Sequence, residues 1–275
     1  MCIRDRYNDT LKVFHDPIPE HIYAITVDTS RGVGNDYSAF VVVDVTEPTY
    51  KVVATFRNNT IAPMLYPKFI VTAAKMYNDA VVMVEINDIG AQVADIIHNE
   101  YEYEGLIKAQ WKGRAGQLVG GGFGGGESQL GVRTTSSLKR IGCSSLKTIV
   151  ENDRLIISDF DVLSELTTFV ANKRGTNYEA EDGMTDDLAI CLVLFAWLTD
   201  QDYFKQLTDI DIRKNLYRQN EQAIEDELVP FGFIDAGTSA DVSQDDDEFK
   251  GGELVSFEEL DFDAIGTIYE QESGF

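Results

Sequence analysis

Acidic side chains stand beside three apolar runs of the sequence. Asp28 follows the run Ile22–Val27, and Glu85 follows Val81–Val84. The pair Asp186–Asp187 directly precedes a third apolar stretch. An acid at the end of a buried strand or helix is costly to desolvate, so three such placements indicate carboxylates gathered at one edge of a sheet.

A cluster of this kind needs a cation. Carboxylates about 4 Å apart repel by about 4 kcal/mol per pair at an effective dielectric constant of about 20. Oxygen ligands without an accompanying histidine or cysteine favour Mg²⁺ or Mn²⁺ over zinc. Such a site suits two-metal hydrolysis of a phosphodiester, in which one ion activates water and the other stabilises the leaving oxygen.

Each acidic position also has a structural explanation. Asp28 precedes a segment rich in turn-forming residues, so ordinary hairpin chemistry would account for it. Thr185 followed by two aspartates is a good helix start, because threonine caps and aspartate complements the helix dipole. Glu85 is harder to explain in this way, since it follows four residues typical of a fully buried strand. Taken together and in this order, the three positions favour a functional site.

The surrounding sequences point to one family. The segments Val27–Ala39, Val84–Asn87, Gly142–Lys147 and Gly183–Leu188 resemble the C-terminal nuclease domain of the large terminase subunit of tailed bacteriophages, of the myovirus type. That domain belongs to the RNase H-like superfamily, so the resemblance implies an α/β fold, an RNase H-like mixed sheet flanked by helices. The resemblance covers residues 20–200.

In that family the nuclease acids are an Asp ending the first strand, a Glu ending the fourth, and one Asp of a late Asp-Asp pair. The resemblance places these catalytic and metal-binding roles on Asp28, Glu85, and either Asp186 or Asp187, with two Mg²⁺ or Mn²⁺ ions. Asp36 matches a further acidic position and is a candidate outer ligand, although a turn aspartate is an equal alternative. Many relatives carry His before the pair, and this chain has Thr there.

The resemblance implies a metal-dependent endonuclease that cuts concatemeric double-stranded DNA at the initiation and termination of packaging. The implied partners are double-stranded DNA, the phage portal protein, the small terminase subunit and an N-terminal ATPase domain upstream of this chain. The implied location is the host cytoplasm, transiently at the procapsid portal. Alternatives are a RuvC-like junction resolvase or another RNase H-type nuclease, and a non-catalytic DNA- or portal-docking module.

The net charge of −24 by itself argues against a DNA-binding protein. The acids are concentrated at the C-terminus, where residues 199–275 carry 21 acidic and 5 basic side chains. The segment 108–147 is instead basic, with a net charge of +6, and we predict that it contacts DNA phosphates without reading bases. The predicted DNA-binding side chains are Lys112, Arg114, Arg133, Lys139, Arg140 and Lys147. A solvated basic helix face is the alternative.

Three regions are expected. Residues 1–19 form a leader, whose first six residues resemble a translated sequencing adapter and are treated as an artefact. Residues 20–200 form the nuclease domain, in which the glycine-rich run Gly120–Gly126 lacks the ending of a phosphate-binding loop, so we expect no ATPase activity. Residues 201–275 form an acidic extension, a helix followed by a flexible segment that either binds a partner or solubilises the protein.

Hydropathy predicts an antiparallel meander followed by strand–helix units. The expected strands are 22–28, 38–45, 50–57, 81–86, 106–110 and 154–158, and the expected helices are 64–78, 90–101, 134–152, 160–172 and 185–199. The apolar stretch Leu188–Leu198 is too short to span a membrane and predicts a buried helix. Pairing of the strand 81–86 beside the strand 22–28 would bring Glu85 next to Asp28.

Overall fold

The computed structural model describes residues 4–7, 10–34, 36–111, 117–119, 128–172 and 178–209, with residues 4–7 and Trp111 described by their backbone only. The glycine-rich run and nearly all of the predicted acidic extension lie outside these residues.

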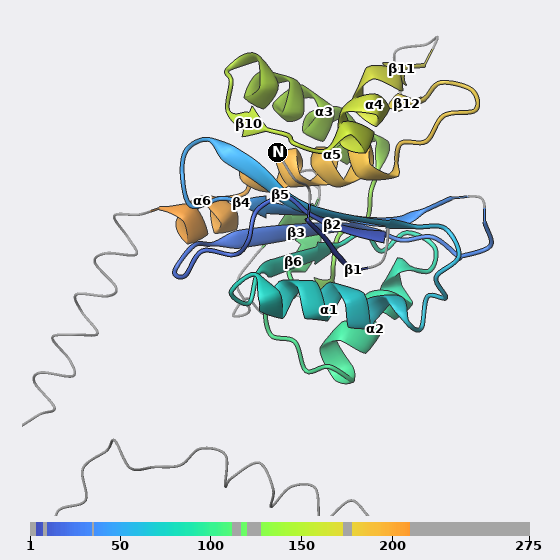
Figure 1. Cartoon of the computed structure of the whole chain (residues 1–275), viewed down its shortest axis with the longest axis vertical. Helices are drawn as coiled ribbons and strands as arrows, with labels where there is room; N and C mark the ends of the chain where they lie inside the picture. Colours follow the sequence, from blue (N-terminus) through green and yellow to red (C-terminus); the bar gives the residue numbers. More distant parts are fainter. Residues whose placement is uncertain are drawn as a thin grey trace, which may run out of the picture. The chain divides into compact units, whose positions relative to one another are not determined.

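A mixed β-sheet forms the centre of the described chain (Figure 1). Its strands lie in the order β1 (Arg4–Tyr7), β2 (Leu11–Val13), β5 (Tyr50–Asn58), β4 (Ser38–Asp44), β3 (Tyr23–Asp28) and β6 (Val81–Val84), and β10 (Leu155–Ile156) pairs with the start of β5. Strands β3, β4 and β5 form the antiparallel meander that the sequence predicts. Strand β6 is parallel to β3, also as predicted.

Helices cover both faces of the sheet (Figure 1). One face carries α1 (Tyr66–Met76) and α2 (Gly90–Asn99), and the other carries α3 (Ser136–Glu151), α4 (Phe160–Thr168) and α5 (Asp187–Thr199). Successive strand residues therefore enter different cores: Ala39 and Val41 pack on the α5 side, and Phe40 packs on the α1 side. Because both faces are buried, the strands are continuous apolar runs without polar alternation.

Helix α5 is buried from Asp187 to Leu198, which confirms the predicted buried helix. It lies between α3 and the strands β3 and β4, and a helix enclosed in this way is apolar on every side. A Cβ atom on Gly142 of α3 would lie 2.5 Å from the carbonyl oxygen of Val193, so the two helices touch where only glycine fits. No described helix is both long and apolar enough to cross a membrane.

Two predicted elements differ from those observed. The helix predicted for 160–172 ends at Thr168, because the next residues form β11 (Phe169–Ala171) paired with β12 (Tyr178–Ala180), where aromatic and β-branched side chains favour a strand. The strand predicted for 106–110 joins a separate small sheet as β7 (Lys108–Trp111), between β8 (Gln117–Val119) and β9 (Ser128–Leu130). A short helix, α6 (Asp202–Thr208), follows α5.

The leader contributes to the main sheet. Strand β2 is antiparallel to β5, with Leu11 opposite Phe56 and Val13 opposite Ala54. Leu11 and Val13 are buried among the residues of the α1-side core. The expected boundary at residue 20 therefore falls inside the sheet, because these two apolar side chains need the core to escape water.

Candidate metal centre

Asp28 and Glu85 lie at the same edge of the sheet. Val27 is paired with Val84 in the parallel β3–β6 ladder, and the Glu85 amide donates to the Val27 carbonyl oxygen at 2.9 Å. The two carboxyl groups share a side-chain hydrogen bond. The predicted neighbourhood of Asp28 and Glu85 is confirmed, and it follows from strand pairing alone.

Asp28 faces helix α5. Two residues earlier on the same side of β3, the Thr26 hydroxyl donates to the Cys191 carbonyl oxygen of α5 at 2.8 Å. Asp187 is the first residue of this helix and is buried, and its Oδ1 atom accepts the Tyr37 backbone N–H at 3.1 Å. The charge of Asp187 acts on Asp28, so three acids from β3, β6 and α5 belong to one electrostatic group.

Asp28 and Asp187 hold their protons more tightly than ordinary carboxylic acids do. Burial, followed by the charges of Glu85 and Asp187, raises the pKa of Asp28 well above its usual range. Burial, followed by the charge of Glu165, raises the pKa of Asp187 to about 7 despite the opposing effects of the Tyr37 N–H and Arg57. In the absence of a cation, a proton is the nearest available positive charge for such a cluster.

Asp186 and Asp187 differ in their surroundings. Asp187 accepts the Tyr37 N–H and its charge acts on Asp28, whereas an Asp186 oxygen lies 3.8 Å from the Lys139 amino nitrogen of α3, with 30% of the Asp186 side chain exposed. Consecutive residues at a helix start project in different directions, which separates the two carboxylates. Strand pairing therefore places Glu85 beside Asp28, the charge of Asp187 acts on Asp28, and Asp186 lies beside Lys139.

Two further residues fix Glu85, and neither was predicted. The Asn87 amide nitrogen donates to a Glu85 carboxylate oxygen at 2.9 Å and to the Thr134 carbonyl oxygen at 3.0 Å. A Cβ on Gly90, at the start of α2, would lie 1.8 Å from the Glu85 carbonyl oxygen, so α2 begins directly against this strand end. Asn87 and Gly90 follow Glu85 closely in the sequence, and this short spacing is the feature from which their roles could have been predicted.

Comparison with known proteins decides the family. A family model described as the terminase RNase H-like domain matches residues 25–202. The chain belongs to this family. Its structure is similar to the large terminase nuclease of thermophilic phage G20c with bound magnesium, at 22% identity and a TM-score of 0.52. The cobalt-bound form of that nuclease matches at 21% identity and a TM-score of 0.53.

Each of these two matches covers 70% of this chain and 88% of the other. At this level of identity the likeness establishes the fold, and the predicted RNase H-like mixed sheet flanked by helices is confirmed. The matched range 25–202 contains Asp28, Glu85, Asp186 and Asp187. This terminase domain therefore has the fold of a phage packaging nuclease.

The carboxylates of Asp28 and Glu85, beside the Asn87 amide, are donor groups that suit a hard divalent cation. Among the described residues, however, no three His, Cys, Asp or Glu side chains lie close enough together to hold a metal ion. The donor atoms of Asp28 and Glu85 fit a hard divalent ion in their chemistry.

The other predicted residues have varied positions. Asp36 is exposed, one residue before Tyr37. Lys112 and Arg114 lie outside the described residues. On α3, Arg140 and Lys147 are exposed, and Lys147 lies 3.6 Å from Glu151. The remaining two are Arg133, which is exposed, and Lys139, which is partly buried between Asp186 and the Phe169 ring.

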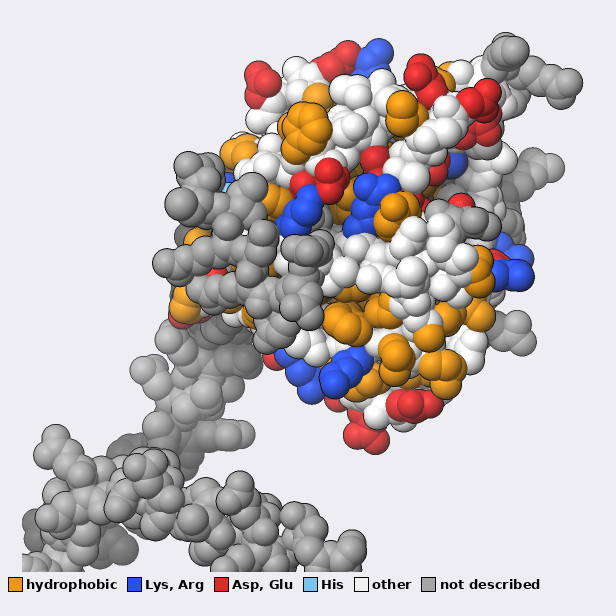
Figure 2. Space-filling view, turned by 45° about the vertical axis from the view of Figure 1, so that its right-hand side comes forward, with side chains coloured by type: hydrophobic (Ala, Val, Ile, Leu, Met, Phe, Trp, Pro, Cys, Tyr) orange, Lys and Arg blue, Asp and Glu red, His pale blue; other side chains and the backbone are white. Residues whose placement is uncertain are grey.

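The DNA-binding role of these basic residues stays a prediction. On the face shown in Figure 2, basic side chains are interspersed with acidic ones across the middle of the molecule. Charge of both signs over such a surface attracts DNA less than a continuous basic stripe would. Among the described members of the set, Lys139 and Lys147 lie beside an acidic side chain. Arg133 and Arg140 are exposed and form no ion pair with another described residue.

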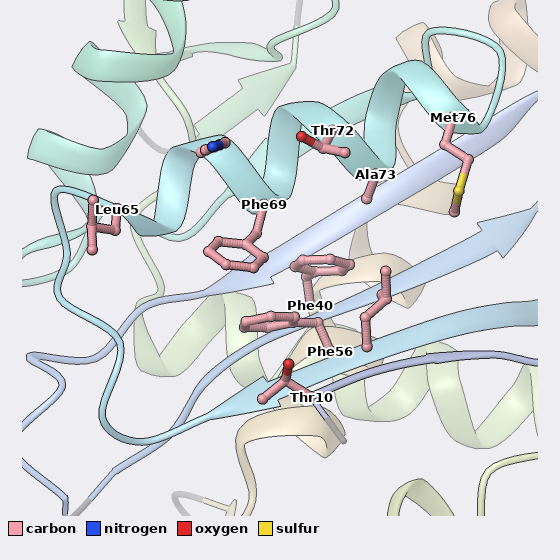
Figure 3. Close-up of a pocket in the computed structure, with 10 residues that line it drawn as sticks. Thr10, Phe40, Phe56, Leu65, Phe69, Thr72, Ala73 and Met76 are labelled. Carbon is pink, nitrogen blue, oxygen red and sulfur yellow. The ribbon is translucent and has the colours of Figure 1, made fainter. Parts of the chain in front are cut away.

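An apolar groove of about 570 Å³ lies between α1 and the sheet (Figure 3). Its walls include Phe40, Phe56, Phe69 and Met76, and Lys68 is the charged residue among those that line it. Phe40 and Phe56 point away from α5, so the groove is on the opposite face of the sheet from Asp28. None of the described residues that line the groove carries a carboxylate, so these residues do not supply the chemistry of a nuclease site.

Proposed function

We propose that this terminase domain is a Mg²⁺- or Mn²⁺-dependent endonuclease that cuts concatemeric double-stranded DNA at the initiation and termination of packaging. One observation supports the proposal: Glu85 lies beside Asp28 at one edge of the sheet, and the charges of Glu85 and of Asp187, at the start of α5, both act on Asp28. A protein interior tolerates such a group where function requires it. The magnesium and cobalt bound to the similar G20c nuclease support a divalent cation.

Asp28, Glu85 and Asp187 are the proposed metal ligands. A bound pair of ions supplies a water nucleophile at neutral pH and stabilises the leaving oxygen of the phosphodiester. Asn87 holds one Glu85 oxygen, and the Tyr37 N–H holds one Asp187 oxygen, so each of these carboxylates keeps its other oxygen for the ion. Asp186, beside Lys139, is assigned no inner role.

Cation binding at this site is expected to replace protons. Ligand carboxylates must be ionised, so the raised pKa values of Asp28 and Asp187 imply that binding releases protons near neutral pH. A bound ion would also offset the repulsion that the charges of Glu85 and Asp187 exert on Asp28. We therefore expect Asp187 to move closer to Asp28 and Glu85 when the ion binds.

The proposed substrate contacts are phosphate contacts by Arg133, Arg140 and Lys147, with little dependence on base sequence. Asp36 remains a proposed outer ligand. The partners that this function requires are the phage portal protein, the small terminase subunit and an ATPase domain upstream of this chain. The place of action is the host cytoplasm, at the procapsid portal during packaging.

Cleavage of supercoiled plasmid tests the proposal. The purified chain would be incubated in EDTA, Mg²⁺ or Mn²⁺, beside Glu85→Ala and a control, Glu151→Ala, which removes an exposed acid of α3. We expect metal-dependent nicking and linearisation in the wild type and the control, and none in Glu85→Ala. Cleavage in EDTA, or full activity of Glu85→Ala, would refute the metal site.

A further inference from the structure

Helix α5, which begins with Asp187, is capped from another helix. The first backbone N–H groups of a helix need acceptors outside it, and an N-cap side chain usually supplies one. The N-cap of α5 is Asp186, whose side chain makes no capping bond. Instead Glu165 of α4 accepts the N–H groups of Leu188 and Ala189 through its Oε2 atom, at 2.7 and 3.0 Å.

The second oxygen of Glu165 joins α5 to the sheet. Oε1 accepts the Thr185 hydroxyl at 3.1 Å and lies 3.4 Å from the Nη2 atom of Arg57. The same Arg57 nitrogen donates to the Thr185 hydroxyl oxygen at 2.6 Å. Glu165 is only 4% exposed, so its charge depends on these partners rather than on water.

The network closes around Asp187. The Arg57 guanidinium lies 3.9 Å from the centre of the Tyr37 ring, and the Tyr37 backbone N–H donates to Asp187. Arg57 also shares a lateral row of the sheet with Asp28, since Ala39 of β4 is the cross-strand partner of both. Arg57 is two strands from Asp28, about 10 Å away. Its guanidinium contacts the helix start through Thr185 and Glu165.

We propose that Glu165, held by Arg57, is a positioning residue that sets the start of α5 and so places Asp187 beside Asp28 and Glu85. This inference rests on the proposed function, because the purpose of the placement is a metal site. Without the Glu165 carboxylate the first turn of α5 loses its acceptors, and Asp187 loses its fixed position.

The structure provides a matched control on the same helix. Asp159 is the N-cap of α4, is 2% exposed, and accepts the Asp161 N–H, the Thr55 hydroxyl and the Lys12 amino group at 3.0, 2.6 and 3.3 Å. Like Glu165, it is a buried carboxylate that ties α4 to the sheet. Unlike Glu165, it makes none of the bonds at the α5 start.

The experiment compares the full chain with its Glu165→Gln and Asp159→Asn variants by calorimetric titration with Mn²⁺, by thermal unfolding and by amide hydrogen exchange. Glutamine keeps an acceptor oxygen but turns an NH₂ group toward Arg57 or the helix start. We expect Glu165→Gln to weaken Mn²⁺ binding about tenfold or more, as loss of an outer-shell partner does, and to speed exchange at Leu188 and Ala189. Asp159→Asn should lower the melting temperature and leave both readouts unchanged.

If Glu165→Gln binds Mn²⁺ as the wild type does, with both variants equally destabilised, Glu165 is only structural and the positioning role is wrong. If the wild type itself neither binds Mn²⁺ nor cuts DNA, the proposed function fails, and exchange at Leu188 and Ala189 still decides whether Glu165 fixes the helix start. Should Glu165→Gln fail to fold, Arg57→Met tests the same network. Unchanged Mn²⁺ affinity in a folded Arg57→Met would also overturn the proposal.

Discussion

Two groups of buried acids lie on the α5 side of the sheet, and they differ in how their charge is balanced. Asp159 is surrounded by donors, including the amino group of Lys12. Asp28 instead faces other acids, and its carboxyl group shares a hydrogen bond with Glu85. The first arrangement is typical of a structural carboxylate, and the second raises the pKa of Asp28.

The difference in charge compensation shows which of the two acidic groups destabilises the folded protein. A buried acid with full partners helps to hold elements together, while clustered acids destabilise the protein until a cation or a proton joins them. The two groups lie on different strands of the same sheet, since Asp159 contacts Thr55 of β5 and Asp28 ends β3. Burial alone therefore does not identify a site, whereas burial without compensating charge does.

The largest expected effect is the loss of DNA cleavage when Asp28 is replaced. Asp28→Asn removes a proposed metal ligand and one negative charge, so we expect plasmid cleavage in Mg²⁺ to fall at least about 10³-fold while DNA binding stays equal or becomes tighter. Asp159→Asn, which disturbs the compensated group, should retain cleavage near the wild-type level at 25 °C. Retained Mg²⁺-dependent activity in Asp28→Asn would contradict the assignment.

In EDTA, replacing an aspartate by asparagine should raise the free energy of unfolding in the Asp28 group and lower it at Asp159. The pKa of Asp187 is about 7 in the folded protein against 3.8 ordinarily, so the folded state binds a proton that the unfolded chain releases between these values. This contribution to the free energy of unfolding is complete below pH 4 and is lost as the pH rises through 7. We expect Asp187→Asn to exceed the wild type at pH 8 by about 2–4 kcal/mol, and Asp159→Asn to be less stable than the wild type.

Urea unfolding in EDTA at pH 5 and pH 8 measures this difference. At pH 5 the wild-type Asp187 is largely protonated, so the advantage of Asp187→Asn should shrink there. An Asp187→Asn variant that is less stable than the wild type at pH 8 would show that the ionised carboxylate is already compensated in the metal-free protein.

Stabilisation by Mn²⁺ should also differ between the Asp28 and Asp159 variants. Because ligands must ionise, metal binding competes with protons, and the melting temperature should rise more at pH 8 than at pH 5.5. At a free Mn²⁺ concentration of 100 Kd the gain at pH 8 is about 2.7 kcal/mol. The gain should persist in Asp159→Asn and vanish in Asp28→Asn. Differential scanning calorimetry provides the measurement, and equal gains at both pH values would argue against coupled proton release.

Much of the fold could be predicted because its signals are local. The apolar runs at β3, β4, β5 and β6 were long enough to identify, and the order of these strands sufficed to place Glu85 beside Asp28. Strand β2 was missed because three residues are too few to show a period, and its burial depends on pairing with β5. The end of α4 was missed because β11 exists only through its pairing with β12.

The choice between Asp186 and Asp187 could not be predicted for a different reason. Which of two consecutive aspartates faces the sheet depends on where α5 begins, and that point is fixed by Glu165, a residue of another helix. The threonine at 185, taken from the sequence as a possible cap, instead bonds Glu165 and Arg57. A contact of this kind between distant residues leaves no trace in local sequence patterns.

The smallest expected effect is on DNA binding by the basic residues of α3, where a lysine beside an acid can be compared with an exposed arginine. Lys139 lies near Asp186 and over the Phe169 ring, whereas Arg140 is exposed. Arg140→Ala should therefore weaken binding of every double-stranded DNA sequence alike and lower the slope of log K against log salt by about 1. Lys139→Ala should change the slope less, because part of its charge is already neutralised. Fluorescence anisotropy from 50 to 200 mM salt gives both slopes, and an unaltered slope in both variants would place the DNA path away from α3.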